Sequence, residues 1–230
     1  MVTRRDLLTR GLLGAAGLSL AGCASATPTT RPEPSGSPTM AARPQPSSGS
    51  PTATGNASRT LVAVFSRAGE NHYYGGRTWL EVGNTEVVVG LLATLVDVDV
   101  YRIVPAEPYP TDYEETVAQN TREQDAGARP RIADPLPDLA GYDRVVLASG
   151  VWSVRPPMIM RTFTEALDFT GRTVYPSTTH AGSGLGRAVE VYRQTRRGAT
   201  LGEGLAVRGE EAAAAEPEVR AWLQRIGLLG

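Results

Sequence analysis

The sequence contains no lysine, one cysteine and two histidines, and the shortages of cysteine and of histidine each exclude a class of site. With Cys23 as the only cysteine, the rest of the chain can hold no disulfide, no thiol nucleophile and no thiolate metal centre. His72 and His180 alone do not supply the ligands of a typical zinc site. Any redox chemistry in this protein therefore depends on an organic cofactor.

The chain also lacks an excess of charge of either sign. Its formal net charge is -1 at pH 7, so no strong field attracts it to nucleic acid, and we expect no nucleic-acid partner. Hydrophobic residues make up 41% of the sequence, which is ordinary for a globular protein, but they are unevenly distributed. Their distribution divides the chain into three segments.

Residues 1–23 have the pattern of an export signal. "TRRDLLTR" resembles the twin-arginine signal, and the apolar run "GLLGAAGLSLAG" that follows is too short to cross a hydrocarbon core of ~30 Å. "LAGC" at residues 20–23 is similar to a bacterial lipobox, which predicts lipidation of Cys23. The alternative is a simple secretory signal with a chance cysteine. We expect export by the twin-arginine route and a lipid anchor on the outer side of the cytoplasmic membrane, in the cell envelope.

Residues 24–58 are rich in proline, serine and threonine and contain almost no large apolar side chains. Such a segment cannot offset the entropy of ordering itself, so we predict a disordered linker. Residues 59–230 are long enough to bury one hydrophobic core and are the predicted folded domain.

Within the domain, short apolar runs rich in branched residues alternate with patterns of helical period. The predicted strands are 60–66, 97–104, 143–150, 172–179 and 199–207. The predicted helices are 84–96, 111–126, 156–167, 184–195 and 215–227. Strands that alternate with helices indicate an α/β domain with a mostly parallel sheet covered on both faces. Ligands of such sheets bind beyond the carboxyl ends of the strands, so the loops after the strands are the candidate site.

The loop after the first strand carries a polar signal twice. Ser66 and Arg67 follow the apolar run, and Gly83, Asn84 and Thr85 precede the first helical pattern. Hydroxyl groups and the free N–H groups of a helix N-terminus suit a phosphate dianion, although Asn84 or Thr85 alone is compatible with an ordinary helix cap.

Two later loops complete the candidate site. "SGVWSVRPPMIM" at residues 149–160 holds Trp152 on a stiff backbone, either beside a ligand or partly within the core. "STTHAGSGLGRA" at residues 177–188 has three glycines that permit close approach of a planar or anionic ligand. We expect His180 to form hydrogen bonds. The alternative is that it acts as a proton donor. A hydrolase using Ser183 and His180 is disfavoured, because Ala181 stands where a nucleophile elbow has glycine.

Four stretches together resemble the flavodoxin-like family, in its branch of bacterial flavodoxins and NAD(P)H–quinone reductases: "VFSRAG…VGNTE", "EPYPTDYEETVAQNTREQDAGARPRI", "YDRVVLASGVWSVRPPMIMRTF" and "THAGSGLGRA…GATLGEGLAVRG". The resemblance implies a three-layer sandwich with a five-stranded parallel sheet in the order 2-1-3-4-5. It also implies FMN as cofactor, with its phosphate at Ser66, Arg67, Asn84 and Thr85. The flavin ring would lie between two groups of residues: Gly150, Val151, Trp152 and Ser153 on one side, and Thr179, His180, Ala181, Gly182 and Gly184 on the other.

The sequence departs from the family pattern at residues 70–82, where "ENHYYGGRTWLEV" interrupts the phosphate loop. We interpret the loop as one loop, with Ser66 and Thr85 at its two ends and the insertion folded out as a flap. Tyr73, Tyr74 or Trp79 would then cover the cofactor, or the insertion packs on the surface as a hairpin.

The sequence therefore predicts an FMN-binding redox protein tethered at the cell envelope. It would carry electrons to a partner protein, or reduce a quinone with NAD(P)H as donor. The alternative is a binding or scaffolding lipoprotein that kept the fold and lost the flavin.

Overall fold

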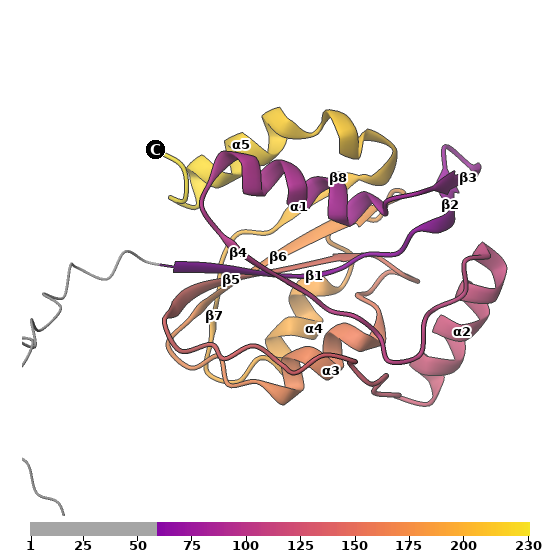
Figure 1. The fold of residues 1–230 in the computed structure, drawn as a ribbon, viewed down its shortest axis with the longest axis horizontal. Helices are drawn as coiled ribbons and strands as arrows, with labels where there is room; N and C mark the ends of the chain where they lie inside the picture. Colours follow the sequence, from indigo (N-terminus) through magenta and orange to yellow (C-terminus); the bar gives the residue numbers. More distant parts are fainter. Residues whose placement is uncertain (1–58) are drawn as a thin grey trace, which may run out of the picture. The chain divides into compact units, whose positions relative to one another are not determined.

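The structure, a computed structural model, describes residues 59–230 (Figure 1). The predicted export signal at 1–23, its lipidation site Cys23 and the predicted linker at 24–58 lie outside the described residues. No helix within residues 59–230 is long and apolar enough to span a membrane. Those same residues contain no group of three or more histidine, aspartate or glutamate side chains placed to hold a metal ion.

The core of the domain is a six-stranded sheet in which all paired strands are parallel. β4 (Asp99–Arg102), β1 (Arg59–Phe65), β5 (Tyr142–Gly150) and β6 (Thr173–His180) lie side by side in that order. The edge beyond β6 is shared by β7 (Thr200–Leu201) and β8 (Leu205–Arg208), which pair with different parts of β6. The mostly parallel sheet predicted from the sequence is thus confirmed.

The last position of the sheet differs from the prediction, which placed one continuous strand at residues 199–207 and five strands in all. Gly202 packs so closely on Tyr175 that a Cβ atom at residue 202 would lie 2.2 Å from the ring. The carbonyl of Glu203 turns to accept a hydrogen bond of 3.0 Å from the indole N–H of Trp222. These contacts take residues 202–204 out of the ladder, so the strand is divided in two.

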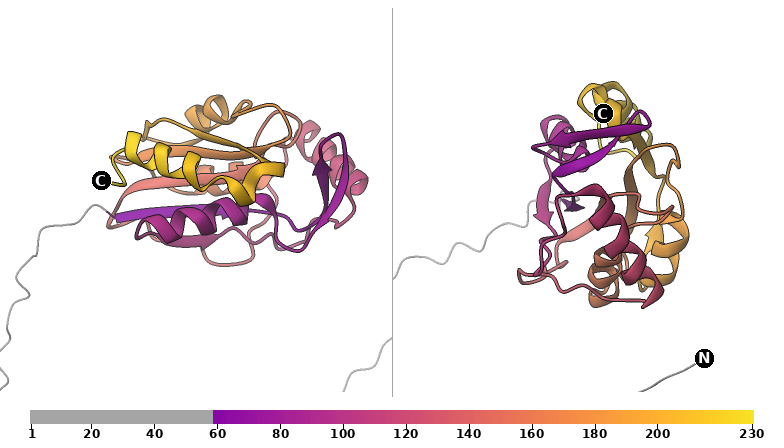
Figure 2. Two further views of the ribbon diagram at one scale, coloured as in Figure 1. Left: turned by 90° about the horizontal axis from the view of Figure 1, so that it is seen from above. Right: turned by 90° about the vertical axis from the view of Figure 1, so that its right-hand side faces the viewer.

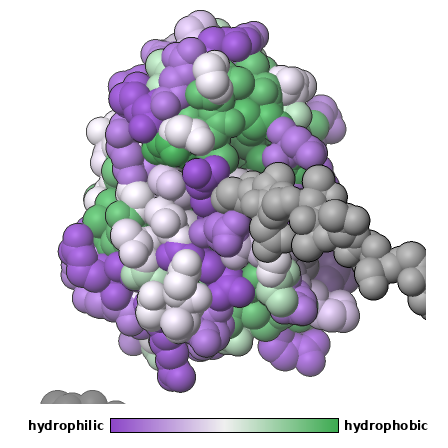
Figure 3. All heavy atoms as spheres, turned by 90° about the vertical axis from the view of Figure 1, so that its left-hand side faces the viewer, coloured by the Kyte–Doolittle hydropathy of each residue, from purple (hydrophilic) through white to green (hydrophobic). Residues whose placement is uncertain are grey.

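Helices cover both faces of the sheet, and Figures 1 and 2 show the two layers. α1 (Asn84–Leu95), the 3-10 helix η1 (Gly209–Ala214) and α5 (Glu216–Arg225) lie on one face. α3 (Met158–Ala166) and α4 (Ala188–Thr195) lie on the other. Figure 3 shows the molecule from the end at which the strands begin. Hydrophobic residues gather at the top of this view, on the side of α1 and α5.

Alternation along β1 explains why its sequence is apolar without interruption. Leu61, Ala63 and Phe65 join the core cluster beneath α3 and α4. Val62 and Val64 join the cluster beneath α1 and α5. Because successive side chains of a strand point to opposite faces, a strand covered on both sides needs apolar residues at every position.

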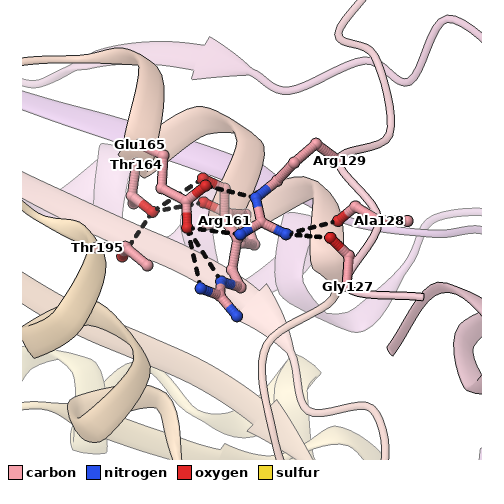
Figure 4. Close-up of polar contacts among 8 residues, drawn as sticks. Gly127, Ala128, Arg129, Arg161, Thr164, Glu165 and Thr195 are labelled. Carbon is pink, nitrogen blue, oxygen red and sulfur yellow. Dashed lines mark hydrogen bonds and ion pairs between the residues drawn. The ribbon is translucent and has the colours of Figure 1, made fainter. Parts of the chain in front are cut away.

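α2 (Tyr113–Asp125) lies apart from both layers, beyond the carboxyl ends of the strands (Figures 1 and 2). It begins at Asp112, whose side chain accepts a hydrogen bond from the N–H of Glu115 and caps the helix. The segment that follows its end is held by Arg129, which donates to the carbonyls of Gly127 and Ala128 and pairs with Glu165 of α3 (Figure 4).

The insertion forms a separate two-stranded hairpin of β2 (Gly69–Tyr73) and β3 (Gly76–Leu80), paired antiparallel. Its turn is made by Tyr74 and Gly75, which both have positive φ, at 44° and 83°. Two such residues between paired strands are typical of a tight hairpin turn. The hairpin lies next to α2 at the carboxyl edge of the sheet (Figures 1 and 2).

Candidate functional site

A pocket of about 350 Å³ lies at the carboxyl ends of β1, β5 and β6. Its wall is formed by the loops that follow these strands, together with the hairpin, α2 and the start of η1. Most of the predicted site residues line it: Ser66, Arg67, Asn84, Thr85, Gly150, Val151, Trp152, Ser153, Thr179, His180 and Ala181. Gly182 and Gly184 are not among the lining residues. The three predicted loops therefore meet at one pocket.

The two ends of the interrupted first loop are in contact. The hydroxyl oxygen of Ser66 accepts a hydrogen bond of 3.1 Å from the N–H of Glu86, in the first turn of α1. This contact requires glycine at residue 83, because a Cβ atom there would lie 2.4 Å from Ser66 Oγ and 2.5 Å from the carbonyl oxygen of Arg67. The chain thus enters and leaves the hairpin at the same place, and the two ends of the loop meet as if the insertion were absent.

The first turn of α1 offers donors to a ligand. Among the described residues, no acceptor takes the N–H of Asn84 or Thr85. These groups lie at the positive end of the helix dipole, which stabilises an anion. The Thr85 hydroxyl is buried and lies 2.7 Å from the Thr179 hydroxyl, so it joins the start of α1 to the end of β6.

Arg67 lines the pocket, but its guanidinium group is directed at the protein backbone. It donates hydrogen bonds to the carbonyl oxygens of Glu70, Pro110 and Thr111. Burial lowers the pKa of Arg67 from its usual value, and nearby acidic groups oppose that effect. The side chain therefore braces the base of the hairpin against the segment before α2, and it adds a positive charge to the pocket wall.

The second loop reverses direction in a tight turn. The N–H of Trp152 donates to the carbonyl of Arg155, and the two central residues, Ser153 and Val154, have φ of 48° and 62°. Positive φ is strained for a β-branched residue such as Val154, and such strain is concentrated at functional sites. Trp152 satisfies both interpretations made from the sequence, because it lines the pocket and also contacts Phe65 and Tyr109 edge to face.

The third loop is held against the second by its last glycine. Gly186 has φ of 49°, and a Cβ atom there would lie 2.5 Å from the carbonyl oxygen of Val154. Gly182 and Gly184 contact nothing at the Cβ position. The glycines predicted to approach a ligand thus differ in role, and Gly186 serves the contact between the two loops. Ser183, the nucleophile of the hydrolase alternative, does not line the pocket.

The hairpin contributes polar side chains to the pocket, not the aromatic cover considered from the sequence. Tyr73, Tyr74 and Trp79 are exposed and lie outside the lining. The lining residues of the hairpin are Asn71 and His72.

One wall of the pocket is a face of α2 that was not predicted from the sequence. Its members recur at helical spacing: Tyr113, Thr116, Val117 and Asn120. Asn120 donates to the Ser153 hydroxyl, and Gln124 donates to the Trp152 carbonyl, so this face also holds the second loop. These residues have the i, i+3, i+4, i+7 spacing of one helix face. They are mostly polar, so the sequence does not show them as the apolar stripe that marks an inward-facing side of a helix.

The sequence model of the family described as Flavodoxin matches residues 79–226, which is more than half of the chain. A solved structure from Bacteroides eggerthii DSM 20697, described as a candidate flavoprotein, is 28% identical, covers 74% of this chain and 98% of its own, and has a TM-score of 0.59. A second, from Bacteroides uniformis ATCC 8492 with the same description, is 27% identical, covers 73% and 98%, and has a TM-score of 0.58. A flavoprotein from Lactobacillus acidophilus NCFM, solved in complex with FMN, is 17% identical, covers 69% of this chain and 98% of its own, and has a TM-score of 0.49. No curated protein matches the chain.

The contact between Ser66 and Gly83 predicts opposite effects of alanine at two glycines. We expect Gly83→Ala to lower the free energy of unfolding by about 2 kcal/mol, because the new methyl group overlaps Ser66 and Arg67. Gly90→Ala, where a Cβ atom meets nothing within 4 Å, is the matched control and should raise it by about 0.5 kcal/mol. Urea denaturation of the two variants measures both values. Equal stability of Gly83→Ala and the wild type would show that the loop ends do not touch.

A second prediction concerns His180, whose pKa is lowered below its usual 6.5 by burial and by the positive charge of Arg208. Glu210, Glu218 and Glu211 oppose this shift without reversing it. Below pH 6.5 the unfolded chain binds a proton at this residue that the folded chain does not bind, so folding loses stability as the pH falls. We expect the stability of the wild type to fall relative to His180→Asn between pH 7.5 and 5.5, measured by denaturation. A constant difference would contradict the shift.

Proposed function

Because the chain belongs to the flavodoxin family, we propose that it binds FMN in the pocket and acts as a redox protein at the cell envelope. The observation that supports this most directly is the closed first loop, which places Ser66 beside the unpaired N–H groups of Asn84 and Thr85. That donor set suits the phosphate of a mononucleotide.

The remainder of the pocket suits a planar ring. The second and third loops stand on neighbouring strands, β5 and β6, and their backbones are held together by the contact of Gly186 with Val154. Trp152 is on the second loop, and His180 and Ala181 are on the third. The volume of about 350 Å³ is within the range of small-molecule sites, roughly 300–1,000 Å³.

FMN, when bound, supplies transfer of one or two electrons. The protein's part would be to bind the phosphate at the start of α1 and to hold the ring between the second and third loops. Phe65 and Trp152 line the pocket, and together with Tyr109 they form an aromatic cluster in which each ring contacts the other two. Such a wall lowers the local dielectric constant around a bound ring and thereby influences its reduction potential.

Two redox roles fit this site, and they differ in partner. A carrier would exchange single electrons with another protein, whereas a reductase would accept hydride from NAD(P)H and reduce a quinone. Stereospecific oxidation of NAD(P)H by the purified flavoprotein supports the reductase, and its absence supports the carrier.

We further propose that the domain is tethered through a lipid on Cys23, after export by the twin-arginine route. The support is in the sequence, where paired arginines, a short apolar run and "LAGC" occur in the order of a lipoprotein signal. Acyl chains on one cysteine anchor a protein by about 0.8 kcal/mol per buried CH₂. Cys23→Ala should move the protein from the membrane fraction to the soluble fraction of the envelope, and unchanged fractionation would rule out the anchor.

A second candidate function, a flavin-free binding module of the same fold, is favoured by two details of the pocket. The guanidinium group of Arg67 is already committed to backbone carbonyls, and the buried carboxylate of Glu210 is part of the wall. Both details reduce the positive charge available to a phosphate.

The two functions are separated by reconstitution. We expect purified protein incubated with FMN to stay yellow through gel filtration, with one flavin bound per chain. Ser66→Ala should weaken FMN binding by about tenfold, through loss of a hydrogen bond to a charged group. Its thermal unfolding without flavin serves as the control for loss of the helix cap. A colourless wild type after incubation would refute the redox function and leave the binding module.

A further inference from the structure

The inserted hairpin brings His72 into the pocket wall, and both ends of its first strand are fixed. At the base, the N–H of Glu70 donates to the carbonyl of Thr111 at 2.8 Å, and its carboxylate accepts from the N–H of Tyr113 at 3.1 Å. At the tip, the N–H of Tyr74 donates to Glu210 Oε1 at 3.1 Å. Because β2 is held on both sides of the pocket, His72 has a defined position there.

Glu210 faces one nitrogen of that imidazole ring. His72 Nδ1 lies 3.3 Å from Glu210 Oε1, and the Glu210 side chain is only 1% exposed. Within residues 59–230, neither His72 Nδ1 nor Glu210 Oε2 has a hydrogen-bond partner, and Arg208 Nε lies 3.9 Å from Oε2. Nδ1 is the ring nitrogen close to the carboxylate, which leaves Nε2 for a ligand.

The carboxylate of Glu210 is ionised at neutral pH. Burial opposes ionisation, but hydrogen bonds from its own N–H and that of Tyr74, with the charges of Arg208 and His72, hold the pKa of Glu210 below its usual range. A buried negative charge in a pocket wall repels a phosphate dianion, and the repulsion is strong where water is scarce.

The residue before Glu210 contacts the start of α1. Gly209, the neighbour of Glu210, contacts Asn84 so closely that a Cβ atom at residue 209 would lie 2.6 Å from Asn84 Nδ2. His72, Glu210, Asn84 and Thr85 all line the same pocket. The end of the pocket that suits a phosphate thus has an acid beside it, and a histidine next to that acid.

We propose that His72 is a ligand of the FMN phosphate, contributed by the insertion, and that its imidazolium form screens the phosphate from the Glu210 carboxylate. Glu210 is a positioning residue that orients the ring through Nδ1 and leaves Nε2–H for a phosphate oxygen. The inference rests on the proposed function, because it concerns the same site, and it adds a cationic ligand from a segment outside the closed first loop.

The phosphate group of the ligand provides the test. Affinities for FMN and for riboflavin, which lacks the phosphate, are measured by quenching of flavin fluorescence on the wild type and on His72→Gln. We expect His72→Gln to weaken FMN binding by about tenfold, the loss of one charge-assisted hydrogen bond, and to change riboflavin binding by less than about twofold. Tyr73→Gln, a neighbour on β2 outside the pocket lining, is the matched control and should change neither affinity.

The double variant separates electrostatic screening from a structural role of the pair. If His72 screens the carboxylate, adding Glu210→Gln to His72→Gln removes the exposed charge and raises FMN affinity again. A structural role predicts a further loss instead. Equal weakening of FMN and riboflavin by His72→Gln, or no recovery in the double variant, would overturn the inference.

A flavin-free measurement distinguishes failure of this inference from failure of the proposed function. The chain has only two histidines, so nitrogen-15 signals of the imidazole rings can be assigned by comparison with His72→Gln. Inorganic phosphate should shift the signals of His72 and not those of His180, and Glu210→Gln should change the Nδ1 signal of His72. A wild type that binds no FMN but shows this response refutes the redox function and keeps His72 as a phosphate ligand beside Glu210. Unmoved His72 signals on a protein that binds FMN refute the inference alone.

Discussion

The hydrogen bond between the N–H of Glu86 and the hydroxyl of Ser66 is the contact on which the pocket depends. It fixes the end of β1 against the start of α1, and glycine at residue 83 is what allows the two to approach. Everything else in the site is placed relative to that junction. The contact of the Thr85 hydroxyl with Thr179 connects this junction to β6. The hydrogen bonds of Arg67 connect it to the segment before α2. The two ends of the loop already meet, so a segment as long as the hairpin can be inserted between them. The entropic cost of closing a loop rises only slowly with its length.

The ligand-facing surface is built mostly from backbone that is held by neighbouring loops. The second loop has two non-glycine residues of positive φ, and it keeps this strained turn because Asn120, Gln124 and the third loop restrain it. Arg187, in the third loop, donates its N–H to the carbonyl of Val154 at 2.7 Å. Strain of this kind persists only where the surroundings determine the conformation, so the pocket is preorganised by the fold.

The sequence predicted the fold class and the loops of the site because both depend on local pattern. Apolar strands, helical period and the motifs around Ser66, Trp152 and His180 are readable along the chain, and the structure brings these motifs to one pocket. The division of the last strand was not readable, since it arises from contacts of Gly202 and Glu203 with Tyr175 and Trp222, which are distant in sequence. The pairing of His72 with Glu210 was hidden for the same reason, because the turn at Tyr74 determines which residues of the hairpin reach the pocket.

The position of β1 has a mechanical consequence. Its first residue, Arg59, is at the amino end of the strand, and the pocket is at the carboxyl ends of the strands. β1 lies between β4 and β5, with ladder hydrogen bonds to both (Figure 1). A pulling force applied at Arg59 acts along the strand, so the ladders on both flanks bear it together in shear and do not open one bond at a time. Tension from anything attached upstream is thus spread over the centre of the sheet, at the end away from the pocket.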